Sequence, residues 1–168
     1  MKNFKFGFGF WVGIGSIILI VLLVWVGGAS QKAKEEKVQN SPSHDVALSC
    51  TTDMATVFHI HSMLSIVING AKQVIPANIG VSDACMHPLH THDDLGTIHI
   101  ESPVQKDFTL GDFFAVWGKD FSSSKILDNT TDASHAITIS VNGVKVETFE
   151  NTILKDKDQI VISFGKKS

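Results

Sequence analysis

The chain has 168 residues, a formal net charge of −3 at pH 7, and no arginine among its 14 basic residues. This weakly acidic balance argues against the basic surface that nucleic-acid-binding proteins need, so no nucleic-acid partner is expected. The length leaves room for one folded domain beside a membrane anchor.

Residues 6–29 form one apolar run without a charged side chain. As a helix the run would extend about 36 Å, enough to cross a bilayer core of about 30 Å. It therefore predicts a transmembrane anchor after a short cytoplasmic N-terminus, residues 1–5. A cleaved signal peptide is the alternative, because Gly27, Gly28 and Ala29 are small, but the run is longer than the usual apolar core of such peptides.

Lysines flank both ends of this run, so the positive-inside rule does not fix its orientation. The N-terminal position of the run, two cysteines that could pair in an oxidising compartment, and a sequon at Asn129 favour export of the remaining chain. We predict a single-pass protein of the cell membrane with its domain on the extracytoplasmic side.

Residues 30–49 are polar and show no sustained apolar period. This composition predicts a tether, in which His44 is a solvated residue. Residues 50–168 are numerous enough for one domain with its own core.

Residues 57–68 alternate between two chemistries, as expected for a strand with one buried face. His59, His61 and Met63 share the face opposite the aliphatic side chains. The turn Asn69-Gly70 then predicts a hairpin that returns through residues 73–75.

Three further elements follow. Residues 110–117 are predicted as a short helix, with Thr109 as N-cap and Asp112 as the acid of a capping box. A second hairpin is predicted over residues 137–147, and a last strand over residues 159–164. The predicted fold class is α+β, a mainly antiparallel sheet with one short helix; a β-sandwich of cupredoxin type is the alternative.

Six of the eight histidines lie between His59 and His99. Residues two apart on a strand point to the same face, so the pairs His59/His61 and His90/His92 can each aim two imidazoles at one point. Imidazole suits zinc and copper, and three histidines with an open position are typical of catalytic sites. The spacing predicts a transition-metal site, zinc or copper, with His99 as a further ligand.

The role of His99 depends on the hairpin around Gly96. If Asp93 pairs with Gly96, His90 lies opposite His99 and the histidines face one way. If Gly96 forms a bulge, His99 and Glu101 turn to the other face, where they could join Asp93 in an outer shell or a separate site. The sequence leaves both registers open.

Two further sets of residues have alternative roles. Cys50 and Cys85 could form a disulfide outside the cell. Alternatively, the run Cys85-Met86-His87, with Met63 nearby, could offer soft sulfur ligands for Cu(I). The disulfide is favoured. Met63 and His87 are otherwise additional candidates near the site.

Two resemblances are visible. Residues 141–162 resemble the last strands of ubiquitin-like β-grasp proteins, which implies a β-grasp-like sheet. A longer set of motifs comprises His59-x-His61, IPANIG (residues 75–80), LHTHD (89–93), GTIHIES (96–102) and LGDFFAVWG (110–118). This set resembles a family of membrane-anchored, extracytoplasmic, histidine-rich domains of archaea and some bacteria. The resemblance implies a cellular location and no established activity; relatives often carry a third histidine where Met63 stands.

Three classes of function are compatible with these features. The first is a metal-binding module that captures, buffers or delivers copper or zinc at the membrane. The second is a metalloenzyme of hydratase, hydrolase or oxygenase type, with Glu101 or Asp93 as proton shuttle. The third is a structural subunit of a membrane complex that docks a partner through exposed aromatic side chains at Phe113, Phe114 and Trp117.

Overall fold

The computed structural model describes residues 36–52 and 56–167. It separates two compact units, residues 1–40 and residues 41–168, and only residues 36–40 of the first are described, as helix. No helix in these described ranges is long and apolar enough to cross a membrane. The predicted anchor, residues 6–29, lies outside them.

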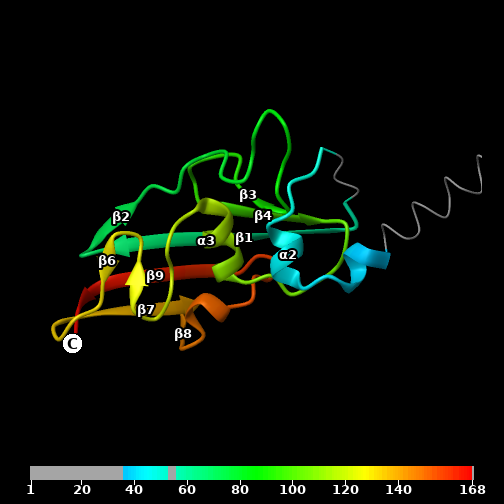
Figure 1. Cartoon of the computed structure of the whole chain (residues 1–168). Helices are drawn as coiled ribbons and strands as arrows, with labels where there is room; N and C mark the ends of the chain where they lie inside the picture. Colours follow the sequence, from blue (N-terminus) through cyan, green and yellow to red (C-terminus); the bar gives the residue numbers. More distant parts are fainter. Residues whose placement is uncertain (1–35, 53–55, 168) are drawn as a thin grey trace, which may run out of the picture. The chain divides into compact units, whose positions relative to one another are not determined.

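The second unit contains short helices around a long curved sheet (Figure 1). Its elements are α2 (Ser43–Ala47), β1 (Phe58–Ile68), β2 (Ala71–Gln73), β3 (Leu89–His90), β4 (Thr97–Ser102), α3 (Leu110–Trp117), β5 (Lys125–Ile126), β6 (Asn129–Thr130), β7 (His135–Val141), β8 (Val144–Val146), η1 (Phe149–Asn151) and β9 (Gln159–Lys166). The α+β class is confirmed.

Seven strands form one mixed sheet in the order β3-β4-β1-β9-β7-β8, with β2 also paired to β1. The pairing of β1 with β9 is parallel, and the other pairings between its strands are antiparallel. Along one edge of β1, residues 58–63 pair with β4 and residues 66–68 with β2. β1 therefore joins the two parts of the sheet.

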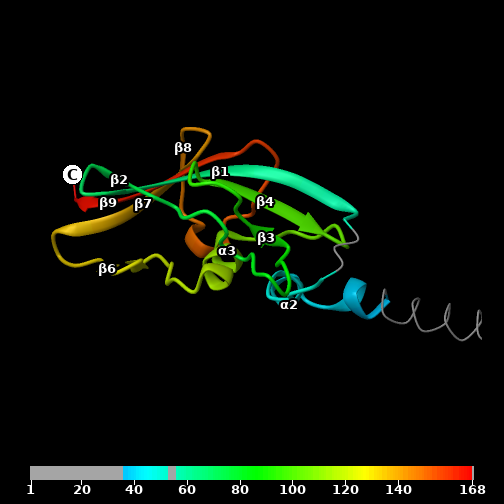
Figure 2. The same ribbon diagram turned by 90° about the horizontal axis from the view of Figure 1, so that it is seen from above.

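The core lies on one face of this sheet. Leu64 and Ile66 of β1, Ile98 and Ile100 of β4, and Ile160 and Ile162 of β9 are all buried there. Figure 2 shows α2 and α3 on one side of the sheet. The alternation predicted for residues 57–68 is thus confirmed for β1, which leaves His59 and His61 on the other face.

Helix α3 has the predicted bounds, Leu110–Trp117. Thr109 accepts a hydrogen bond from the Asp112 amide, and the Asp112 carboxylate accepts one from the Thr109 amide, so the capping box is confirmed. Phe113 and Phe114 are fully buried. The expectation that they form an exposed docking surface is wrong, because they fill the core.

The predicted tether differs from the structure over its second half. The unit starts at Ser41, and Val46 and Ala47 of α2 are buried. His44 is predicted to be solvated, and its side chain is 56% exposed, but its Nδ1 also lies 2.7 Å from Oδ1 of Asp112 in α3. Apolar burial and this hydrogen bond attach α2 to the domain. The two hydrogen-bonded residues are 68 positions apart, so local composition does not encode their contact.

Candidate metal centre

Five imidazoles and one carboxylate gather on the sheet face opposite the core. His59 and His61 come from β1, His90 ends β3, His92 follows it, and His99 and Glu101 come from β4. Their donor atoms form two groups that could each hold a metal ion. One contains His59, His61 and His99; the other contains His90, His92, His99 and Glu101.

Strand register brings these residues together. His99 pairs with His61 on one side and with His90 on the other, and Glu101 pairs with His59. Residues that pair across a ladder point to the same face, so three strands contribute to one cluster. Of the two registers left open by the sequence, the structure adopts the one that places His90 opposite His99.

The backbone around His61 explains how close the rings come. The His61 amide donates to Oδ1 of Asp156 at 3.1 Å, and its carbonyl accepts from the Lys157 amide at 2.6 Å. These bonds point away from β4, so His61 and His99 form a non-hydrogen-bonded pair, in which side chains approach most closely. The sequence does not predict these contacts of Asp156 and Lys157, since nothing local links the two residues to β1.

The nitrogen separations match those of metal ligands. Nε2 of His61 lies 3.1 Å from Nε2 of His59 and 3.1 Å from Nδ1 of His99. Two nitrogens on one tetrahedral zinc, each bound at about 2.0–2.1 Å, would be about 3.3 Å apart. A neutral ring nitrogen carries either one proton or one lone pair, and a hydrogen bond between two ring nitrogens needs one of each. Hydrogen bonds alone therefore cannot satisfy all three nitrogens well. An ion between them would satisfy all three.

The second histidine pair is oriented by the backbone. Nδ1 of His90 lies 2.9 Å from the carbonyl oxygen of His87, which can only accept, so Nδ1–H donates. In the neutral ring the proton on Nδ1 leaves a lone pair on Nε2, which lies 3.2 Å from Nε2 of His92. A carbonyl that fixes a histidine tautomer in this way is typical of metal sites.

Burial keeps part of the cluster unprotonated. The side chain of His90 is 0% exposed, and this burial lowers its pKa from 6.5 to about 4. Burial also lowers the pKa of His99, and the neighbouring His61 and His92 add to that effect by charge repulsion. Low pKa values keep imidazole lone pairs available to a cation at neutral pH.

Other predicted residues lie outside the two groups. Met63 is 42% exposed on the His61 face of β1 and pairs with Thr97. His87 supplies its carbonyl, and its buried Nδ1 has no partner among the described residues. Asp93 accepts from the Leu95 amide at 3.0 Å, as a turn residue does.

Cys50 and Cys85 are joined in a disulfide. A disulfide sulfur is not a thiolate, so this arrangement provides no soft Cu(I) ligand from Cys85. Next to the disulfide, the backbones of Thr51 and Met86 exchange hydrogen bonds of 3.1 and 3.0 Å. Together these links hold the segment that leads to His87 and His90.

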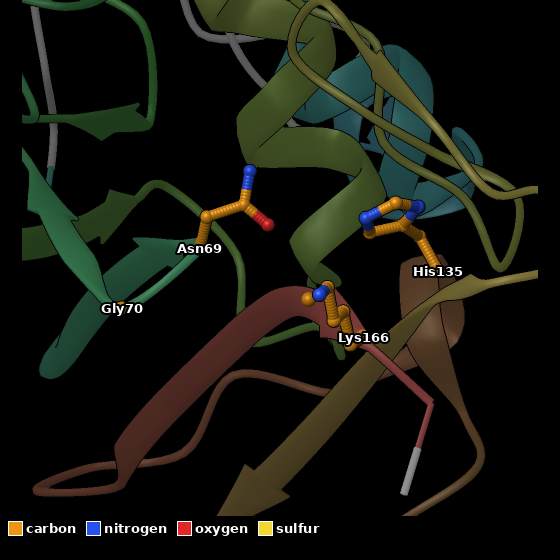
Figure 3. Close-up of a pocket in the computed structure, with 5 residues that line it drawn as sticks. Asn69, Gly70, His135 and Lys166 are labelled. Carbon is orange, nitrogen blue, oxygen red and sulfur yellow. The ribbon is translucent and has the colours of Figure 1, made fainter.

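A separate pocket of about 490 Å³ lies at the other end of β1. Asn69, Gly70, His135, Gly165 and Lys166 line it (Figure 3). The His135 ring stacks on Phe164 with centroids 5.5 Å apart, and its Nδ1 lies 3.1 Å from Asp132. His135 thus has structural partners and makes a useful control residue outside the cluster.

Comparisons of the chain with protein-family models, curated proteins and solved structures find no match. The chemistry of the cluster is therefore interpreted from its own geometry. Imidazole nitrogens with one carboxylate suit zinc and copper better than calcium or magnesium, which prefer oxygen ligands.

Proposed function

We propose that the chain is a membrane-anchored protein with an extracytoplasmic domain that binds copper or zinc through its histidine cluster. The observation that carries this proposal is the convergence of three ring nitrogens, from His59, His61 and His99, with successive separations of 3.1 Å. Supporting evidence comes from the tautomer of His90, whose Nε2 lone pair faces the cluster.

The partial exposure of the cluster suits exchange of a metal ion with the solvent. The side chain of His59 is 47% exposed and His92 is exposed, whereas His90 is fully buried. An ion could first meet the exposed imidazoles and then gain the buried ligand. The proposed role is capture, buffering or delivery of the ion at the membrane.

A metalloenzyme is the second candidate. Glu101 favours it, because its Oε1 lies 3.1 Å from Nε2 of His59 and the side chain is 19% exposed. A carboxylate at this position could accept a proton from water bound to an ion in an open site. Activity toward hydratase or hydrolase substrates, lost in Glu101→Gln when rates are compared per bound metal ion, would distinguish catalysis from binding.

We also propose two assignments of fold and family. The order β2-β1-β9-β7-β8, with β1 and β9 parallel and α3 between the hairpins, supports a β-grasp-like core extended by β3 and β4. The motifs around His59, His90 and His99 support membership of the membrane-anchored family that the chain resembles.

The test of metal binding uses the full-length chain, purified in detergent because of its apolar N-terminal run. Bound metals are measured by mass spectrometry after expression and after reconstitution with Zn²⁺ or Cu²⁺. We expect stoichiometric bound metal in the wild type and in His135→Ala. The His61→Ala/His99→Ala double variant should lose most of its bound metal. A wild-type chain without stoichiometric metal would overturn the proposal.

A further inference from the structure

We propose that the cluster holds two metal ions as a dinuclear centre. One ion would bind the β1 pair, His59 and His61, and the other would bind His90 and His92. Glu101 lies between the pairs, where its two carboxylate oxygens can each bind one ion, and His99 completes one of the two positions. This inference rests on the proposed metal-binding function and adds the number and arrangement of the ions.

The first argument is the division of the donors. Two ligands of one ion, each bound at about 2.1 Å, can be at most about 4.2 Å apart. The six donors do not form a single group within 4.8 Å; they form two groups, which have His99 in common. A single ion therefore cannot reach all of them, whereas two adjacent ions can.

The second argument is the position of the Glu101 carboxylate. Its Oε1 lies 3.1 Å from Nε2 of His59 in one pair and 3.9 Å from Nε2 of His90 in the other. The same oxygen is 3.9 Å from Nδ1 of His99. A carboxylate has two oxygens, so one residue at this point can bind an ion on each side.

The third argument concerns charge. Neutral imidazoles bring no negative charge, and two divalent ions close together repel each other strongly in a partly buried site. Glu101 belongs to the group with His90 and His92, and its carboxylate also lies 3.1 Å from Nε2 of His59 in the other group, so its negative charge offsets both ions. Register fixes this place, since Glu101 pairs with His59 and its amide donates to the carbonyl of Pro88, two residues before His90.

The fourth argument is the strand layout. Each pair follows the i, i+2 spacing on its own segment, and each pair keeps its nitrogens 3.1–3.2 Å apart. Each pair can thus form one edge of a separate coordination shell. Strand β4, which lies between the two pairs, supplies Glu101 as the shared ligand and His99 as a further ligand of one ion.

The experiment counts ions. Full-length chain in detergent is stripped with a chelator, reloaded with Zn²⁺, desalted, and analysed for zinc per chain. We expect two zinc ions in the wild type and in His135→Ala. His59→Ala and His92→Ala remove exposed side chains, and each variant should bind one zinc with unchanged circular dichroism.

One zinc per wild-type chain would overturn the dinuclear proposal and leave the proposed function standing, whereas no stoichiometric zinc or copper after reloading with either ion would overturn both. Two zinc ions retained in both alanine variants would also contradict it. Reloading with Cu²⁺ gives an independent test by electron paramagnetic resonance. Magnetic coupling between the two Cu²⁺ ions should make the wild-type signal weaker than its copper content predicts. The His92→Ala variant should show the full signal intensity expected for its single ion. An uncoupled wild-type signal would contradict a ligand shared by the two ions.

Discussion

His61 and His99 lie directly opposite each other on β1 and β4, with Nε2 of the first 3.1 Å from Nδ1 of the second. The backbone bonds of His61 are directed to Asp156 and Lys157, which leaves this pair in the closely spaced position of the ladder. His99 therefore contacts His61 of β1 on one side, and its partner on the other side is His90 of β3.

Because His99 belongs to both donor groups, its removal should weaken metal binding more than the loss of any outer residue. Outer-shell substitutions typically lower metal affinity about 10- to 100-fold, and we expect His99→Ala to exceed that range. Competition titration with a chromophoric zinc chelator measures the change. His135→Ala should bind as the wild type does; equal affinities in all three proteins would rule out this role for His99.

Gly96 holds the register of β4 against β1. Its φ is +92°, its carbonyl accepts from the Leu64 amide at 2.8 Å, and an added Cβ would meet the carbonyl oxygen of Leu64. Gly143 has a similar φ of +81° with open space around it, which makes it a matched control.

Gly143→Ala should cost about 1–2 kcal/mol of unfolding free energy through its backbone conformation alone. Gly96→Ala carries the same strain and the clash with Leu64, so we expect a further loss of about 1–3 kcal/mol. Chemical denaturation of both variants measures the difference. If the two variants proved equally stable, the close approach of Gly96 to Leu64 would not govern the register.

The buried His90 should make the metal-free protein sensitive to acid. Its pKa is about 4 in the folded state against an ordinary value of 6.5, so the unfolded chain binds the proton more readily. The contribution to stability is complete above pH 6.5 and is lost as pH falls from there toward 4. At about 1.4 kcal/mol per unit, the loss is on the order of 3 kcal/mol.

Denaturation in chelator at several pH values tests this expectation. His90→Asn retains a donor for the carbonyl of His87 and does not titrate, so its stability should fall less over the same pH interval. Parallel pH profiles for His90→Asn and wild type would show that another group is responsible.

The disulfide between Cys50 and Cys85 closes a loop of 35 residues. In the chain-entropy model such a link stabilises the folded state by roughly 3 to 4 kcal/mol. We expect the Cys50→Ser/Cys85→Ser double variant to lose about that much free energy of unfolding, and reduction of the wild type to have the same effect. A loss well below 1 kcal/mol in both experiments would mean that the link adds little to the fold.

Much of the local structure follows directly from the sequence. The alternation of residues 57–68 predicts β1 and the face that carries His59 and His61. Thr109 and Asp112 predict where α3 begins. These features depend on residues a few positions apart, whose backbone preferences and periodicity can be read without knowledge of the rest of the chain.

Most of the candidate site was also predicted from the sequence, since the paired spacing singles out His59, His61, His90 and His92 and leaves His99 dependent on the hairpin register. Only the tertiary structure decided that His90 and His61 flank His99, that Glu101 shares their face, and that Asp156 orients the backbone of His61. A shift of one residue at Gly96 would reverse the face of β4. That choice depends on the contact of Gly96 with Leu64, 32 residues earlier in the chain, and no local pattern contains it.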